Sequence, residues 1–515
     1  MKPSRELFEL VKSLTKSEKR FFKLTSSLQS GDKNYLKIFD AIDKQTEYDE
    51  ESIKEQYHGE TFVKHFPSEK NHLYKLILKS LRAYHSDNTV SSVLKQEIKN
   101  IEILYKKALF KECNKFLSRA KKTAIAHEKF YYWFELLNWE KLLLEEAYEA
   151  GEFTRDIDEL IQEEQEVIEK LRNLAAYHVL YSKINFVFRS GGFVRSDEDR
   201  AVVEEISNHP LIKGKNTALS HRAATICYYI QGFCAMANRD TQLSYEKFSR
   251  VREILDQNPL VKKDVARRYV RTLNQILLNL IDLRKMDEAR KLIQTMRSLP
   301  ANAAFASTDI QVLIFRATYQ AELKWYHQKG DFEGALPLID EILKGFADFD
   351  DKISKEQQIV FNYSIAYTYF GAGEYSKALY WNNKVLNDNE PNLRQDIYSY
   401  ARLFNLAIHY ELGNQDLMEY IIKSTARYLN RRQRDYQIEV LILGYMKKIA
   451  RSHFEKDIKP LFEKFYLNLK ENINLKTDRV LLEYFDYFAW AKSKIEGSSF
   501  AESVKERHEK GQLVG

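Results

Sequence analysis

The sequence predicts an all-α fold, an α-solenoid of antiparallel helical hairpins preceded by a small helical N-terminal domain. The first observation is composition: 17 Gly and 8 Pro among 515 residues leave few positions for tight turns, whereas good helix formers are abundant. The second is a pattern of small, aromatic and turn residues that recurs along most of the chain. A chain of this length exceeds one compact core, and the recurrence favours a repeat array over several globular domains.

Residues 1–90 lack the recurring pattern and predict a separate N-terminal helical domain. Thr15-Lys16-Ser17-Glu18 is a capping box, in which the first and last side chains accept hydrogen bonds from each other's main-chain amides at a helix start. Asp49 can cap a shorter helix, and a longer helix follows Pro67. In that longer helix, apolar residues such as Leu73 fall on one face and basic residues on the other.

One hairpin is complete enough to be followed residue by residue. Ser354-Lys355-Glu356-Gln357 is a second capping box and opens a helix over residues 358–370. Gly371-Ala372-Gly373 supplies a turn, and another helix follows over residues 376–386. Two helices joined by so short a turn are expected to pack antiparallel.

Small and aromatic residues of this hairpin occupy positions that suit close helix packing. Ala366 and Ala378 let the two helix backbones approach, while Tyr369 and Tyr375 fill the space around that contact. The same turn pattern recurs in residues 329–336. These residues resemble the tetratricopeptide repeat, and the resemblance implies hairpins that stack into a superhelix.

Weaker copies of the pattern extend the predicted array over residues 91–475. Adjacent copies are spaced by roughly 41 to 46 residues, longer than the standard 34, which implies longer helices or loops. Because an end hairpin has an apolar face that no neighbour covers, a C-terminal capping helix is expected at residues 476–497. A fraying polar tail is expected at residues 498–515. The weaker copies contain Phe110 and Cys113, residues 151–153, Gly232 and Asp240, residues 286–289, and Ala407, Tyr410 and Gly413.

The resemblance also implies where a ligand would bind. In tetratricopeptide arrays the first helix of each hairpin lines the concave surface, and contacts come from positions that face away from the second helix. Here those positions form a mixed aromatic and cationic wall, which suits a protein or peptide partner with apolar anchors and acidic groups. The alternative is that several of these rings pack against the next hairpin. The nominated groove residues are Tyr229, Phe233, Arg271, Asn274, Gln320, Lys324, His327, Tyr363 and Tyr367.

Basic clusters supply a rival interpretation, nucleic-acid binding. Arginine side chains suit phosphates, and aromatic rings can stack on bases. The charge balance argues against a histone-like binder, since the chain has 80 basic and 74 acidic residues and a net charge of only +6. Cations that favour helix ends or lie on solvated helix faces are the alternative. The candidate patches are Arg427, Arg431, Arg432 and Arg434 beside Tyr428; Lys75, Lys79 and Arg82; and Arg267, Arg268 and Arg271 with Tyr269.

No recognisable set of catalytic residues occurs, so the sequence predicts a protein that is not an enzyme and that needs no cofactor or metal. Ser-x-x-Lys matches such as Ser118 to Lys121 are expected by chance in Lys-rich helices. His58, His65 and His72 recur every seventh residue, but Gly59 and Pro67 break the helix that would align them.

Cysteine usage and hydropathy predict a cytoplasmic protein. Cys113, Cys227 and Cys234 lack metal-ligand spacing, and their odd number argues against a disulfide framework. No apolar leader follows Met1, and no window is apolar enough to span a bilayer, so neither export nor membrane insertion is expected.

The leading hypothesis is a non-enzymatic scaffold or adaptor that binds a protein or peptide in the concave groove of the array, with a regulatory role. The organisation is similar to that of bacterial peptide-sensing regulators, which join a small N-terminal helical domain to a repeat array. The alternative hypothesis is a nucleic-acid-binding or transcription-regulatory protein that uses the basic helical patches.

Overall fold

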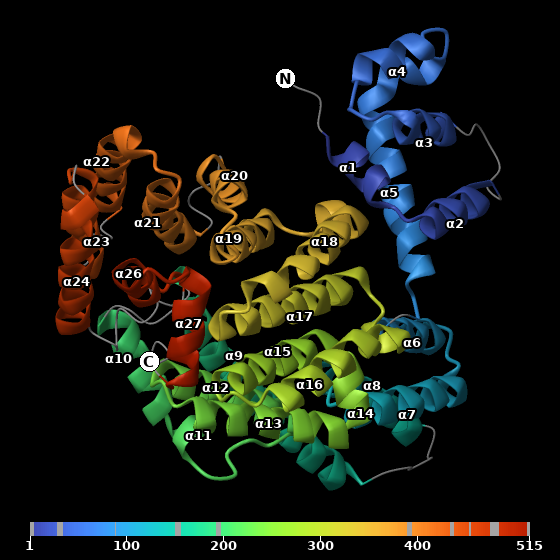
Figure 1. The fold of residues 1–515 in the computed structure, drawn as a ribbon. Helices are drawn as coiled ribbons and strands as arrows, with labels where there is room; N and C mark the ends of the chain where they lie inside the picture. The colour runs from blue at the N-terminus through green and yellow to red at the C-terminus, as the bar shows by residue number, and fades with distance from the viewer. Residues whose placement is uncertain are drawn as a thin grey trace. The chain divides into compact units, whose positions relative to one another are not determined.

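Helices make up nearly all of the structure, a computed structural model that describes residues 5–27, 34–87, 89–149, 156–191, 197–388, 394–432, 437–452, 455–473 and 484–511 (Figure 1). No strand occurs among these residues, so the all-α fold predicted from the sequence is confirmed. The chain divides into two compact units, Met1–Glu169 and Lys170–Gly515.

The first unit begins with six helical segments that share their own apolar core. This core consists entirely of residues between Leu7 and Ile77, with Val11, Ile38 and Phe39 fully buried. Two of the predicted helix caps are confirmed: the amide of Thr15 donates to the Glu18 carboxylate at 2.7 Å, and Asp49 accepts from the amide of Ser52. The helices are α1 (Glu6–Ser13), α2 (Lys16–Ser27), α3 (Asn34–Lys44), α4 (Glu50–Gln56), η1 (Thr61–His65) and α5 (Phe66–Tyr84).

Helices α6 to α9 complete the first unit, and α9 continues into the second. Helices α6 (Val90–Lys106), α7 (Phe110–Ala126) and α8 (Phe130–Glu149) pack in sequence, α6 on α7 and α7 on α8. Helix α9 (Ile157–Gly191) begins in the first unit and ends in the second. Residues 151–153 of the predicted array lie outside the described residues.

The second unit is a row of antiparallel hairpins. Its hairpins are the pairs α12/α13, α15/α16, α17/α18, α19/α20, α21/α22 and α23/α24. The first helix of one hairpin also contacts the first helix of the next, from α15 to α17, α17 to α19 and α19 to α21. We call the surface formed by these first helices the first-helix face. The elements are α10 (Asp197–Asn208), α11 (Pro210–Lys213), α12 (His221–Ala237), α13 (Thr241–Gln257), α14 (Pro259–Asp264), α15 (Ala266–Asp282), α16 (Met286–Ser298), η2 (Leu299–Ala301), η3 (Ala303–Phe305), α17 (Thr308–Lys329), α18 (Phe332–Phe349), η4 (Asp350–Lys352), α19 (Lys355–Gly371), α20 (Tyr375–Leu386), α21 (Gln395–Glu411), α22 (Gln415–Arg431), α23 (Gln437–Ala450), α24 (Glu455–Asn472), α26 (Tyr487–Glu496) and α27 (Phe500–Glu509).

The hairpin α19/α20 matches the prediction closely. Ser354 and Gln357 form the predicted capping box, and Ala366 and Ala378 are both fully buried. Gly371 has a packing role as well as a turn role, because a Cβ atom there would lie 2.1 Å from the Phe332 ring. The local signals in this hairpin therefore specify both the helix start and the close contact between its helices.

The end of the chain differs from the prediction. A fraying polar tail was expected from residue 498, but residues 500–509 form helix α27, which begins with a capping box between Ser499 and Glu502. Phe500 and Val504 are buried, so α27 is packed onto the second unit rather than frayed. The predicted capping helix is represented by α26, and the first residues assigned to it, 476–483, lie outside the described residues.

Candidate partner-binding face

Four of the nine predicted groove residues are core residues. Tyr229 and Phe233 are 3% and 6% exposed, and Tyr363 and Tyr367 are 4% and 7% exposed. The Phe233 ring lies 4.8 Å from Phe188, centre to centre, inside the apolar core of the unit. Because these rings have almost no accessible surface, they stabilise the array and are not available to a ligand in this structure. Contrary to the expectation from the sequence, they do not line an open groove.

His327 and Lys324 are also engaged within the chain. The His327 Nε2 atom lies 2.8 Å from the Thr368 hydroxyl, and its ring centre is 4.9 Å from that of Tyr367. Burial lowers the pKa of His327 to about 3, so the imidazole is neutral near pH 7. The Lys324 ammonium lies 2.8 Å from the Asp282 carboxylate. His327 therefore carries no charge, and the charge of Lys324 is already paired within the chain.

The C-terminal segment, residues 484–511, covers part of the first-helix face. The Tyr363 hydroxyl donates to the main-chain oxygen of Tyr484 at 3.2 Å, and the Tyr367 ring lies 5.8 Å from Phe485. Helix α27 contacts α17, beside which it is drawn in Figure 1. At Gly330 a Cβ atom would lie 2.7 Å from the Ala501 main-chain oxygen, so glycine permits this close approach. The chain thus occupies part of its own predicted groove.

Three predicted groove residues remain available: Arg271 and Asn274 on α15 and Gln320 on α17. All three are half-buried, and their side chains make no hydrogen bond or ion pair with any residue that the structure describes. Arg271 and Asn274 are three residues apart and therefore lie on the same side of α15. Since α15 and α17 pack side by side, the three side chains belong to one stretch of the first-helix face.

Two further arginines lie with Arg271. Arg268 is one turn before it on α15, and Arg316 is one turn before Gln320 on α17; both are half-buried. We call Arg268, Arg271 and Arg316 the arginine cluster. Burial, and next the positive charges of Arg222 and Arg271, lower the pKa of Arg268, partly offset by Tyr181, whose ring centre is 5.7 Å from the Arg268 guanidinium carbon. The cluster therefore concentrates positive charge where water solvates it poorly.

The same surroundings act on Arg316. Burial lowers its pKa, the Glu356 carboxylate opposes that effect, and the charges of Arg271, Arg267 and Arg394 add to it. The nearby arginines outside the cluster each form an ion pair with a carboxylate. Arg222 pairs with Asp264, Arg267 pairs with Asp309 at 2.9 Å, and Arg394 pairs with Asp396 at 2.7 Å and with Glu356 at 3.6 Å.

The arginine cluster itself has no such pairing. Within the described part of the chain, no carboxylate lies within 4.0 Å of the guanidinium nitrogens of Arg268, Arg271 or Arg316. Arg268 and Arg271 were visible in the sequence as part of a basic run, whereas Arg316 was missed because its immediate neighbours, Phe315 and Ala317, are apolar and it belongs to no run of charge. Its spacing of four residues from the nominated Gln320 was the signal that could have found it.

Two of the three basic patches proposed for nucleic acid, those on α22 and α5, lie on exposed helix surfaces. Arg427 and Arg431 are exposed near the end of α22, and the guanidinium carbon of Arg432 is 5.9 Å from the centre of the Tyr428 ring. Arg434 lies outside the described residues. Cations are favoured at a helix C-terminus even without a ligand.

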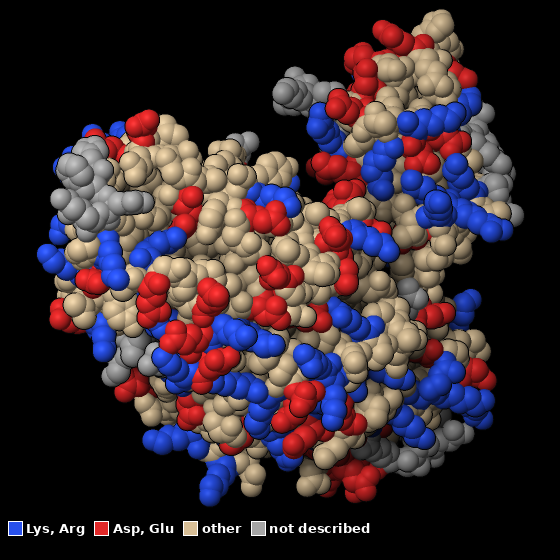
Figure 2. Space-filling model, viewed as in Figure 1, with Lys and Arg blue, Asp and Glu red and all other residues tan. Residues whose placement is uncertain are grey.

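The second patch belongs to the first unit. Lys75, Lys79 and Arg82 are exposed on α5, whose opposite side buries Leu73 and Ile77. Basic and acidic side chains are interspersed over the surface seen in Figure 2, in keeping with the small net charge of +6. Nucleic-acid binding through either patch stays a prediction.

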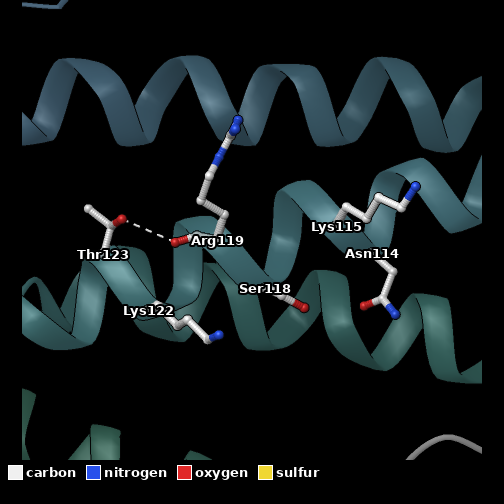
Figure 3. Close-up of a pocket in the computed structure, with 6 residues that line it drawn as sticks. All are labelled: Asn114, Lys115, Ser118, Arg119, Lys122 and Thr123. Carbon is white, nitrogen blue, oxygen red and sulfur yellow. Dashed lines mark hydrogen bonds between the residues drawn. The ribbon is translucent and has the colours of Figure 1, made fainter.

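A recess on α7 shows what an ordinary solvated helix face looks like in this protein (Figure 3). The Arg119 Nη2 atom lies 2.8 Å from both oxygens of the Glu97 carboxylate, and the Thr123 hydroxyl donates to the Arg119 main-chain oxygen at 3.1 Å. Lys121 of the Ser-x-x-Lys match lies 2.6 Å from the Glu140 carboxylate. Its ammonium is therefore held by an acid, and the match to a catalytic motif has a structural explanation.

The described residues also bear on a metal site and on a membrane crossing. No group of three or more His, Cys, Asp or Glu side chains there is arranged to hold a metal ion. His65 lies in η1 and His72 in α5, while His58 lies between α4 and η1. None of the helices described combines the length and apolarity that a membrane crossing requires.

Comparison with known proteins adds no assignment. No protein-family model matches the chain, and no curated protein matches its sequence.

Proposed function

We propose that this chain is a non-enzymatic scaffold or adaptor that binds a protein or peptide partner on its first-helix face. The observation that carries the proposal is the set Arg271, Asn274 and Gln320. These half-buried polar side chains lie on two adjacent helices and have no partner among the described residues. Because these polar groups are not used within the described chain and remain accessible, the set favours a surface to which another molecule can hydrogen-bond.

The architecture suits this role. Each hairpin is fixed by its neighbours, so side chains on successive first helices are held at set spacings along an extended surface. Such a surface can contact a long or helical segment without large rearrangement of its own backbone. The resemblance to tetratricopeptide arrays supports the same assignment, as does the similarity in organisation to bacterial peptide-sensing regulators. In this proposal the protein works in the cytoplasm and its N-terminal helices are a second docking surface.

Site-specific photo-crosslinking tests the proposal in cells of the native host. A photoreactive amino acid replaces Gln320 in the full chain, and a matched control places it at Tyr380, an α20 residue that is 59% exposed. We expect a discrete protein adduct from position 320 that resists nuclease treatment and is absent from position 380. Equal adducts at both positions, or none at position 320, would contradict a partner on this face.

The rival function, nucleic-acid binding, is favoured by one observation, the exposed Arg427 and Arg431 beside Tyr428. Binding through phosphates weakens steeply as salt rises. A filter-binding measurement at two salt concentrations, with Arg427→Gln and Arg431→Gln combined, tests it. Salt-sensitive binding that the double substitution removes would favour the rival function.

A further inference from the structure

We infer that the arginine cluster, Arg268, Arg271 and Arg316, is a binding site for the carboxylate groups of an acidic peptide segment. The inference rests on the proposed scaffold function and names the chemistry of its partner. It depends on where the three guanidinium groups lie, on which nearby acids are already paired, and on the uncharged groups beside them.

The three arginines lie on one surface. Arg268 and Arg271 are one turn apart on α15, and Arg316 lies on α17, which packs directly against α15. A guanidinium group presents a planar fork of N–H donors that matches the two oxygens of a carboxylate. Forks on two adjacent helices can hold acidic side chains at successive places along one peptide.

The local charges favour an acidic ligand. Arg222, Arg267 and Arg394 each have an aspartate partner, whereas the cluster has none among the described residues. Glu356, the acid whose charge opposes the shift at Arg316, is itself 3.6 Å from Arg394. Partial desolvation and mutual repulsion both disfavour three positive charges on one surface, and an opposite charge relieves both effects. A bound carboxylate would supply the missing opposite charge.

The surroundings of the cluster suit a peptide better than a nucleic acid. Nucleic acids bind through many phosphate contacts and through bases stacked on accessible rings. Here Arg268 already faces the Tyr181 ring, and Tyr229 is 3% exposed, so neither ring is open for stacking. Burial, and next the charges of Arg268 and Arg222, lower the pKa of His178, which therefore adds no charge near pH 7. Asn274 and Gln320 offer amide groups that can bond a peptide main chain.

Fluorescence anisotropy with the full-length protein tests the inference. The probes are a fluorescein-labelled peptide of ten glutamates and a labelled oligothymidylate of ten nucleotides, both at low salt. The main variant combines Arg271→Gln and Arg316→Gln. Its matched control is Arg290→Gln, which removes one exposed arginine from α16, the second helix of the α15 hairpin. A further variant, Arg271→Lys with Arg316→Lys, keeps the charges but removes the forks.

We expect the glutamate peptide to bind, and the double Gln variant to weaken its affinity at least tenfold. Arg290→Gln should stay within twofold of wild type, and the double Lys variant should fall between the two. Circular dichroism melting separates loss of binding from loss of fold. The double Gln variant should melt no lower than wild type, because it removes two unpaired, repelling charges.

Three results would overturn the inference: no binding of the glutamate peptide to wild type, equal binding by all variants, or selective binding of the oligothymidylate that the double Gln variant abolishes. The crosslinking measurement at position 320 separates this failure from that of the scaffold proposal. If the cellular partner still forms its adduct in the double Gln variant with undiminished yield, the carboxylate site is wrong and the scaffold stands. If wild type captures no partner, the scaffold itself fails.

Discussion

The Tyr363 hydroxyl donates a hydrogen bond of 3.2 Å to the main-chain oxygen of Tyr484, 121 residues further along the chain. The Tyr484 ring stacks on Tyr400 with their centres 4.3 Å apart, and its hydroxyl lies 3.0 Å from the Asp396 carboxylate. The first-helix face of α19 and α21 is therefore completed by the C-terminal segment. In the part of the chain described, this segment belongs to the fold of the second unit.

Removing the Tyr363 hydroxyl tests this role. In Tyr363→Phe the buried ring stays, but a main-chain acceptor loses its donor, so the free energy of unfolding should fall by about 1 kcal/mol. Urea denaturation measures the change as a lower midpoint at an unchanged slope. Tyr380→Phe is the control, since this side chain is 59% exposed and should change stability by less than about 0.5 kcal/mol. Equal effects at both positions would show that the contact contributes nothing.

The ion pair between Arg507 of α27 and Asp486 should matter more. The two groups are 3.1 Å apart and their side chains are only 10% and 12% exposed. Replacing Arg507 by Met leaves a buried carboxylate unpaired, which should cost about 3 kcal/mol. Asp486 also accepts a hydrogen bond of 2.9 Å from the amide of Ala489 at the start of α26, so the carboxylate keeps one donor.

Arg451→Met supplies the matched control for this pair. Arg451 lies 2.8 Å from Glu419, but the two side chains are 57% and 46% exposed. Exposed pairs contribute little to stability, because water screens them. Urea denaturation of both variants should rank Arg507 far above Arg451. The same small loss for both would mean that α27 is loosely attached.

Replacing each of two glycines by alanine should change the stability of the protein in opposite directions. At Gly371 the new Cβ would lie 2.1 Å from the Phe332 ring, so Gly371→Ala should destabilise the protein by about 1–3 kcal/mol. Gly444 lies inside α23 with no atom within 4 Å of an added Cβ, and alanine there should stabilise the helix by about 0.5–1 kcal/mol. Thermal melting of the two variants checks the signs. A stabilising Gly371→Ala would refute the tight contact between α18 and α19.

Local chemistry explains which features the sequence could predict. Capping at Ser354 and close packing at Ala366 depend on residues a few positions apart, so both were visible in the sequence. The burial of Tyr363 depends on Tyr484, which no local pattern connects to it. The resemblance placed Tyr363 on the face where a ligand would bind, and in the structure the C-terminal segment covers Tyr363 there.

The candidate site was only partly predictable for a similar reason. Arg271 and Gln320 were nominated by helix register, which depends on local spacing. The absence of an ion pair at Arg316 became apparent only when the partners of Arg267 and Arg394 were known, and those contacts join separate helices. Pairing between distant charges is a tertiary property, which a single sequence does not display.

His327 should make stability depend on pH below about 6.5. Burial lowers its folded-state pKa to about 3 from an ordinary value of 6.5, so the unfolded chain binds a proton that the folded chain does not. Folding stability attributable to this group is therefore complete above pH 6.5 and is lost as pH falls toward 3. At pH 5 the loss should reach about 2 kcal/mol.

His327→Gln isolates this contribution from that of other buried histidines. The ring packs 5.6 Å from Phe332, so the substitution should lower stability at pH 7.5. Its stability should then fall less steeply than that of wild type between pH 7.5 and pH 5, because glutamine does not titrate. Urea denaturation at pH 7.5, 6 and 5 measures both slopes, and His58→Gln, at an exposed position, should reproduce the wild-type slope. If the stability of His327→Gln depends on pH as steeply as that of wild type, the imidazole is protonated in the folded protein at pH 5. The description of His327 as a neutral ring bonded to Thr368 would then be wrong.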